Sequence, residues 1–220
     1  MRVLISNSLG QFLSDYPGMS TVPYSDAGVC LRGKFRFKAN ASGNDEIDDS
    51  YELEIVVPEK FPQALPEVKE IGGKIPRDGN FHVNQDGTLC LGSPLRLLSK
   101  VHRFPTLTGF ADKCLIPYLY AVSYKLRHGG NFVFGELAHG EQGIVDDYSL
   151  MVGLKERHQV TEAIQLLGIK KRIANKRPCP CGCGKRLGAC PFRHKLNEFR
   201  KMAPVSWFKA HALMIAPQKI

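Results

Sequence analysis

The chain has 220 residues, of which 43% are hydrophobic, and it carries a formal net charge of +9. This length and composition are typical of one globular domain with a small appendage, and they exclude a disordered or fibrous chain. No apolar run reaches the roughly 18 residues of a membrane span, and residues 1–8 lack a signal-peptide pattern. We therefore expect a cytoplasmic protein with no membrane partner.

The alternation of apolar and polar residues predicts an antiparallel meander in the first third of the chain. The spacing of apolar residues over 4–16 suggests a short helix. Residues 29–38 and 51–57 alternate as half-buried strands do, and the polar stretch 40–50 between them is predicted to be a turn. Residues 68–71 suit a third strand.

The chain then changes to loop and helix patterns. Residues 75–94 are rich in Gly, Pro, Asn and Asp and are predicted to form a long structured loop, which in a compact domain is often functional. Residues 107–126 have helical spacing, with Pro117 dividing the segment. A further helix is predicted over 155–167 and ends at Gly168.

After residue 168 the composition changes to basic residues and cysteine, which predicts two parts, a core domain of residues 1–168 and a tail of residues 169–220. Residues 1–150 hold 15 Lys/Arg against 18 Asp/Glu, a net of −3, whereas residues 151–220 hold 15 against 3, a net of +12. A basic tail can bind nucleic acid or an acidic protein surface, and a merely solvated surface is the alternative.

The loop of residues 75–94 contains a candidate nucleophile, Cys90, preceded by His82 and Asn84. A free thiol is only a few per cent thiolate at neutral pH. A nearby His can accept its proton or supply positive charge, and an Asn amide can donate to an oxyanion when a thioester carbonyl is attacked. A buried cysteine on a turn is the alternative on chemistry alone.

Three motifs, in order, resemble those of the ubiquitin-conjugating (UBC) enzymes. The resemblance covers about residues 25–126, and its motifs are Val56-Val57-Pro58 with Phe61-Pro62 and Leu65-Pro66-Glu67-Val68, then His82-Val83-Asn84 with Cys90-Leu91, then Phe104-Pro105-Thr106-Leu107-Thr108. It implies an α+β fold, a UBC-like antiparallel meander packed against helices, in which Cys90 carries an acyl group as a thioester.

The family resemblance also implies roles for neighbouring residues, with two departures. Val83 replaces the proline of the family's His-Pro-Asn motif, and Asn84 lies closer to the cysteine than in the family, which leaves its oxyanion role open. The segment around His139 looks like bacterial relatives of the family, so His139 is either a second polar wall of the site or a loop histidine capping a turn.

Those bacterial relatives resemble proteins encoded with anti-phage cyclic-nucleotide signalling (CBASS) operons. The implied partners are a protein with a C-terminal carboxyl, either the CD-NTase of such an operon or a ubiquitin-like protein, and an activating enzyme.

Two other classes of function stay open. One is a non-catalytic UBC-fold binding module, against which the presence of Cys90 argues. The other is a nucleic-acid-binding protein that acts through its tail, where Lys170 to Lys201 include eleven Lys/Arg and one acid.

A cysteine cluster stands in the tail. Four cysteines fall within twelve residues, which in a reducing compartment indicates a metal rather than disulfides. The segment Pro178–Cys190 resembles the SEC-C zinc motif, which implies a small knuckle with a structural Zn²⁺ bound by four N or S donors. Cys179, Cys181 and Cys190 supply three donors. His194 is the expected fourth, and Cys183 is the alternative.

Overall fold

The computed structural model describes residues 2–24, 28–41, 43–135 and 140–216. The chain divides into two compact units, the first comprising Met1–Gly92 with Lys100–Glu136 and the second Ser93–Ser99 with Leu137–Ile220. None of the helices within the described residues combines the length and the apolar character that crossing a membrane requires.

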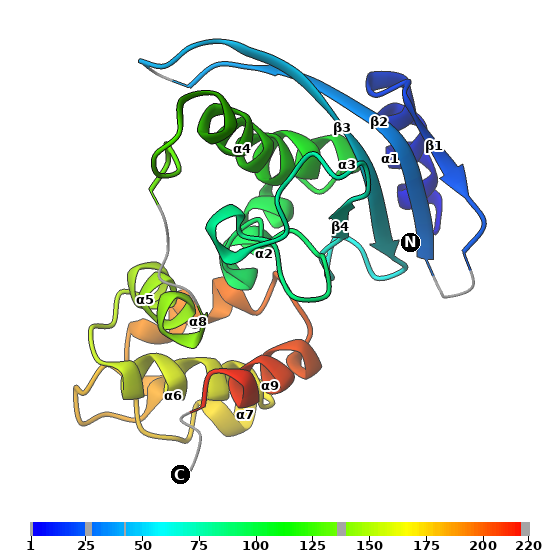
Figure 1. The fold of residues 1–220 in the computed structure, drawn as a ribbon. Coiled ribbons are helices and arrows are strands. Elements are labelled where there is room, and N and C mark those ends of the chain that lie inside the picture. Colours follow the sequence, from blue (N-terminus) through cyan, green and yellow to red (C-terminus); the bar gives the residue numbers. More distant parts are fainter. Residues whose placement is uncertain (1, 25–27, 42, 136–139, 217–220) are drawn as a thin grey trace. The chain divides into compact units, whose positions relative to one another are not determined.

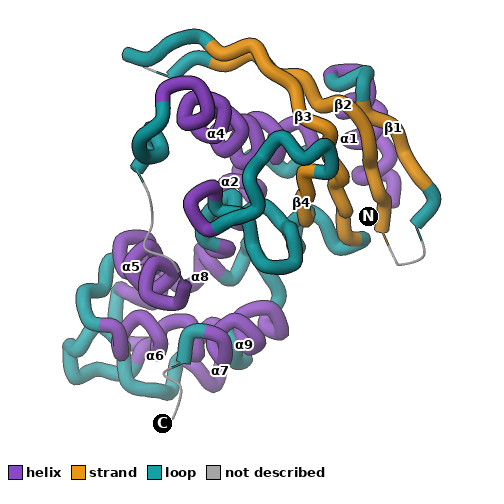
Figure 2. Tube along the Cα trace, in the orientation of Figure 1, coloured by secondary structure: helices purple, strands orange, loops and turns teal. Residues whose placement is uncertain are grey.

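The first unit is built on a four-stranded antiparallel sheet in the order β1-β2-β3-β4 (Figures 1 and 2). Its strands are β1 (Met19–Val22), β2 (Gly28–Ala39), β3 (Ile47–Pro58) and β4 (Glu67–Glu70). The predicted α+β class and antiparallel meander are therefore confirmed, and β1 is an additional strand that the sequence pattern did not indicate.

The β2–β3 hairpin is longer than predicted. We expected residues 40–50 to form a turn, but β3 begins at Ile47, which pairs with Ala39. Cross-strand ion pairs extend the ladder into this polar stretch, because Lys38 contacts Glu46 at 2.8 Å and Arg36 contacts Asp48 at 3.0 Å. Opposite charges on one face of an antiparallel pair favour strand over turn.

The other face of the sheet forms the core of the first unit. The expected apolar positions of β2 and β3 are buried, and Phe35 lies directly opposite Tyr51. Helix α1 (Arg2–Asp15) covers this face through Phe12, whose ring stacks on Phe35 at 6.4 Å between centroids. Helix α4 (Ile116–His128) covers it through Ser123, whose Oγ lies 2.6 Å from the Tyr51 hydroxyl.

The helical segment predicted over 107–126 is divided, as expected, near Pro117. It consists of α3 (Leu107–Phe110), a π-helical turn (Ala111–Leu115) and α4, and Pro117 occupies the first turn of α4 where its missing N–H costs no hydrogen bond. Thr106 caps α3 by accepting the Gly109 N–H at 2.9 Å. Helix α2 (Pro94–Arg103), which the sequence did not indicate, precedes this segment.

The second unit is helical. It contains α5 (Gly140–Val152), α6 (Arg157–Leu167), α7 (Lys171–Ala174), α8 (Phe192–Phe199) and α9 (Val205–Met214). The predicted helix over 155–167 corresponds to α6, and Gly168 follows its last residue as expected. The expected boundary between residues 168 and 169 lies inside this unit, because α6 packs against α8 and α9, which follow the cysteine cluster.

Candidate functional site

The loop that contains Cys90 begins at β4 and is fixed there by a buried carboxylate. Glu70, the last residue of β4, is 5% exposed. Its side-chain oxygens accept the backbone N–H groups of Gly72, Gly73 and Lys74 at 2.9, 2.9 and 3.1 Å. This turn directs the chain away from the sheet into the loop of residues 75–93.

Residues 82–90 then form a short hairpin against the edge of the sheet. The Cys90 N–H donates to the His82 carbonyl at 2.8 Å, and Val83 forms a β-bridge with Leu89. The hairpin is tied to β4 because the Leu89 N–H donates to the Val68 carbonyl at 2.8 Å. Cys90 therefore occupies a defined position directly after the hairpin, beside β4.

Exposure distinguishes Cys90 from the other isolated cysteines. Cys30 and Cys114 are buried, whereas Cys90 is exposed. Burial raises the pKa of the Cys114 thiol to about 11 and also raises the pKa of Cys30. Because the thiolate is the reactive form of cysteine, burial disfavours reaction at Cys30 and Cys114, and Cys90 is the one of the three whose residue is exposed. The alternative of a buried turn cysteine is thus wrong for Cys90.

Asn84 lies at the tip of the hairpin and is engaged in the turn. Its Nδ2 donates to the Thr88 hydroxyl at 2.9 Å, and this hydroxyl donates to the Asp86 carboxylate at 2.6 Å. The Thr88 hydroxyl and N–H lower the pKa of the Asp86 carboxyl. The described geometry thus gives Asn84 a structural contact within the turn.

His82 occupies the base of the hairpin in the left-handed region, with φ of 52°. Its N–H donates to the Gly79 carbonyl at 3.0 Å, closing the 3₁₀ turn Gly79–Phe81, and its ring meets Phe132 edge-on at 4.9 Å. His82, whose carbonyl accepts the Cys90 N–H, is therefore held by both backbone and ring contacts. His139, the other expected histidine, lies outside the described residues.

Two residues of α4 that the sequence did not single out support this loop. The Tyr118 hydroxyl donates to the Phe81 carbonyl at 2.6 Å, and Lys125 Nζ donates to the Asn80 carbonyl at 2.8 Å while lying 4.9 Å from the Phe132 ring centroid. Burial, followed by the negative charge of a Cys90 thiolate, raises the pKa of Tyr118. Helical spacing placed Tyr118 in a helix, but only the fold shows that it reaches the loop.

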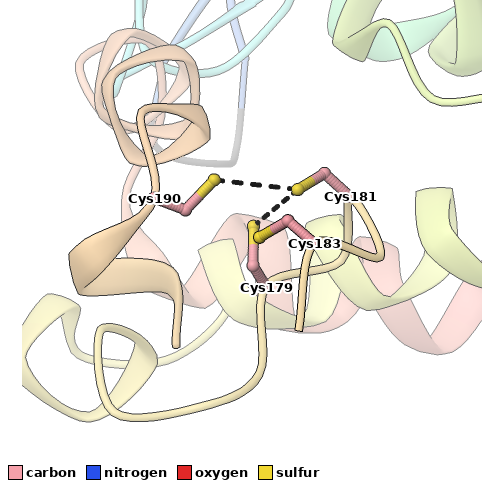
Figure 3. A group of neighbouring side chains, drawn as sticks. All are labelled: Cys179, Cys181, Cys183 and Cys190. Carbon is pink, nitrogen blue, oxygen red and sulfur yellow. Dashed lines mark hydrogen bonds between the residues drawn. The ribbon is translucent and has the colours of Figure 1, made fainter. Parts of the chain in front are cut away.

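The cysteine cluster forms a second candidate site (Figure 3). The sulfur atoms of Cys179, Cys181, Cys183 and Cys190 all lie within 4.8 Å of one another, with Cys179 and Cys181 3.2 Å apart and Cys181 and Cys190 3.7 Å apart. A tetrahedral ion with metal–sulfur bonds of about 2.3 Å requires sulfur atoms about 3.8 Å apart. The four thiols therefore fit a single tetrahedral metal ion.

A small hairpin brings these cysteines together. Pro178 forms a β-bridge with Arg186, and the Cys179 N–H donates to the Lys185 carbonyl at 2.9 Å. Between them, Gly182 and Gly184 have φ of 78° and 72°, which only glycine adopts readily, and these turns direct Cys183 back toward Cys179. Cys190 follows the 3₁₀ turn Leu187–Ala189.

The structure gathers Cys183, and not His194, with the other three cysteines. His194 lies in the first turn of α8, as expected, but it is exposed and is not a member of the group that can hold a metal. Burial raises the pKa of the Cys179 thiol, whereas the Lys185 N–H lowers that of Cys183 to about 7. The donor set that the described residues offer is four thiols.

Comparison of the chain with known protein families, with curated proteins and with solved structures finds no match. What the chain does is therefore argued from the loop of Cys90 and from the cysteine group.

Proposed function

We propose that the chain is a cysteine-dependent acyl carrier of the ubiquitin-conjugating type, in which Cys90 holds the C-terminal carbonyl of a protein as a thioester and passes it to an amine. The observation that supports this most directly is the exposed thiol of Cys90 at the end of a hairpin that is bonded to the edge of the sheet. A nucleophile on a rigid loop is both accessible and positioned, as covalent catalysis requires.

The order of the elements around Cys90 agrees with this proposal. An antiparallel meander precedes the loop, a Pro-rich bend at residues 58–66 joins β3 to β4, and the helical segment that begins at Leu107 follows. The three motifs that resemble those of the ubiquitin-conjugating enzymes lie in this bend, in the loop of Cys90 and at the start of this helical segment. The likeness is one of element order and motif, and the chemistry is inferred from the loop.

The proposed reaction is two acyl transfers. The Cys90 thiolate attacks the carbonyl of a thioester on an activating enzyme, so that the Cys90 S–C bond forms, the donor S–C bond breaks, and the donor leaves as a thiolate. An acceptor amine then attacks the Cys90 thioester, forms an amide, and returns Cys90 to the thiolate, while the amine loses its proton to solvent. His82 supports the nucleophile through its carbonyl, which accepts the Cys90 N–H.

The acyl donor belongs to one of two proposed classes. In the narrower case it is the C-terminus of a CD-NTase in CBASS anti-phage signalling, and in the wider case it is a ubiquitin-like protein. Both present the same chemistry to Cys90, a flexible C-terminal carboxyl that needs prior activation. The mass of the adduct on Cys90 distinguishes them.

For the second site we propose a structural Zn²⁺. Zinc binds four thiolates in a closed tetrahedron, which leaves no open position for substrate. The four cysteines lie at compatible distances, and three of them are contributed by a hairpin too small to fold by apolar burial. The ion would hold the hairpin against α8.

Intact-mass analysis of the protein isolated from its native host tests the acyl transfer. An adduct on Cys90 that an added thiol cleaves by acyl exchange, as it does a thioester, is expected in the wild type. Cys90→Ala should abolish it, Cys90→Ser should trap a thiol-resistant ester, and Cys90→Lys a stable amide.

The buried cysteines provide the matched control. Cys30→Ala and Cys114→Ala should leave the adduct in place. Full conjugation by the Cys90→Ala protein would refute the assignment.

A further inference from the structure

The net positive charge of the chain lies entirely in the second unit. The first unit contains 14 Lys/Arg and 15 Asp/Glu, a net of −1, whereas the second contains 16 and 6, a net of +10. Within the second unit, the stretch from Lys170 to Lys195 holds nine Lys/Arg and no acid. A single stretch around the cysteine group is therefore the source of most of the charge.

These basic side chains are exposed and uncompensated. Eight of the nine are exposed: Lys170, Lys171, Arg172, Lys176, Arg177, Lys185, Arg186 and Lys195. Among the described residues, none of the eight takes part in an ion pair. By contrast, Arg32, Arg36 and Lys38 on β2 each pair with an acid. A divalent ion with four thiolates would contribute only −2, which leaves the stretch strongly positive.

The cysteine hairpin concentrates four of these charges. The Leu187 N–H donates to the Arg177 carbonyl at 2.8 Å, and Pro178 is bridged to Arg186. This pairing places Arg177 opposite Leu187 and Arg186 opposite Pro178, so residues 176–177 and residues 185–186 are diagonal neighbours on strands about 5 Å apart. We call the surface formed by Lys176, Arg177, Lys185 and Arg186 the basic hairpin.

The aromatic residues of this part of the unit are occupied in packing. Phe199 is buried, Phe192 is half-buried, and the Trp207 ring stacks on His211 at 4.6 Å. Between residues 170 and 207 of the described chain no Phe, Tyr or Trp ring is exposed. Binding of single strands relies on exposed rings on which bases stack, so the surface suits a duplex backbone better than an unpaired strand.

From this geometry we infer that the basic hairpin binds the phosphate backbone of double-stranded nucleic acid without reading its sequence. Duplex DNA carries one negative charge per about 1.7 Å of axis, a density that clustered cations match. An acidic protein could bind this surface in the same way only if its carboxylates were spaced as densely as the phosphates of the duplex. This binding is independent of Cys90 and of the acyl transfer proposed above.

Fluorescence anisotropy with the zinc-loaded protein of 220 residues tests the inference. With a labelled DNA duplex of about 20 bp, log K should fall linearly with log salt, by about 0.9 per phosphate neutralised. Replacing all four residues of the basic hairpin by Gln should reduce that slope by about 3–4 and weaken binding at least about tenfold. Zinc content should be unchanged in this variant.

The matched control removes four charges elsewhere. Lys34, Lys60, Arg77 and Arg103, all of the first unit, are exposed, and none of them has an ion pair within the described residues. Their combined change to Gln should weaken binding by less than about threefold, because the proposed contact is made by the basic hairpin. An equal loss in both quadruple variants would overturn the inference, since net charge alone would then explain binding.

Three further results would also overturn it. The first is absence of binding at low salt. The second is tighter binding of single-stranded oligothymidine than of the duplex, which would indicate base stacking. The third is equal affinity for a polyglutamate of matched charge, which would indicate an acidic protein partner.

Discussion

The Tyr118 hydroxyl donates a 2.6 Å hydrogen bond to the carbonyl oxygen of Phe81. Phe81 directly precedes His82, whose carbonyl accepts the Cys90 N–H at 2.8 Å. Because burial raises the pKa of Tyr118, its hydroxyl stays protonated and acts as a donor. Through this bond, helix α4 fixes the base of the hairpin that ends at Cys90.

Tyr118→Phe should therefore impair the positioning of Cys90 for thioester formation and leave the accessibility of its thiol unchanged. Loss of one such hydrogen bond should cost about 1 kcal/mol of stability. Thioester loading should slow by about tenfold, the equivalent of 1.4 kcal/mol, while alkylation of Cys90 by iodoacetamide changes by less than about twofold because the thiol is already exposed. Tyr124→Phe, on the same helix, is the control. Equal slowing of loading and alkylation would contradict a positioning role.

The contact between Asn84 and Thr88 leads to a second prediction. If Asn84 serves the turn, Asn84→Ala removes its bond to Thr88 and should cost about 1 kcal/mol, whereas Thr88→Val also removes the bond to Asp86 and should cost about 2 kcal/mol. Both variants should decrease transfer by less than about tenfold. Single-turnover transfer rates and thermal unfolding measure both effects. An oxyanion donor would behave differently, because Asn84→Ala alone would then slow transfer by about 10²–10³.

Sequence reasoning found the sheet because its signal is local. The alternation in β2 and β3 survives in the fold, since the buried positions Leu31, Phe35 and Tyr51 follow the period of two that one buried face imposes. The pattern misplaced the start of β3 because charged residues signal a turn, whereas the ion pair of Arg36 with Asp48 links β2 to β3 across the ladder. That pairing depends on register, which composition does not contain.

The sites show the same division between local and distant signals. Cysteine spacing identified three thiols of the metal group, but choosing between Cys183 and His194 depended on two glycine turns that direct Cys183 inward. Likewise, Cys90 was identified by its motif, while the support from Tyr118 comes from a residue 28 positions away in the sequence. Contacts between remote elements are not visible in a single sequence.

The metal group leads to a third prediction. Each cysteine variant should release the ion, and Cys183→Ser should reduce zinc retention more than His194→Ala, because only Cys183 lies with the other thiols. Elemental analysis should find one zinc per chain in the wild type. Removal of the ion should unfold the hairpin and destabilise α6 and α8, while the first unit stays folded, since those helices belong to the second unit. Greater loss in His194→Ala would restore His194 as the fourth ligand.

A buried carboxylate in the second unit leads to a fourth prediction. The Asp147 side chain is 2% exposed, receives a bidentate bond from Arg96 and accepts the Ser93 hydroxyl. Asp147→Ala should cost about 3 kcal/mol, the low end for a broken buried pair, because Arg96 is 42% exposed and can be rehydrated. Asp146→Ala, its exposed neighbour, should cost less than about 1 kcal/mol. Chemical denaturation of the two variants compares them, and equal losses would contradict the assigned role of Asp147.

The last prediction concerns acid stability. His211 of α9 is buried against Tyr148 and Trp207, and this burial lowers its pKa to about 4, against about 6.5 in an unfolded chain. Below pH 6.5 His211 binds a proton in the unfolded chain but not in the folded chain. The free energy of unfolding that this group contributes is therefore complete above pH 6.5 and is lost as pH falls toward 4. The loss for the second unit should be about 3 kcal/mol between pH 7 and 4. Acid also releases a thiolate-bound metal, so the decisive quantity is the difference between the wild type and His211→Gln, in which metal loss is shared. Denaturant titrations across this range should show a steeper fall for the wild type, and parallel falls would mean that His211 has the same pKa in the folded and the unfolded chain.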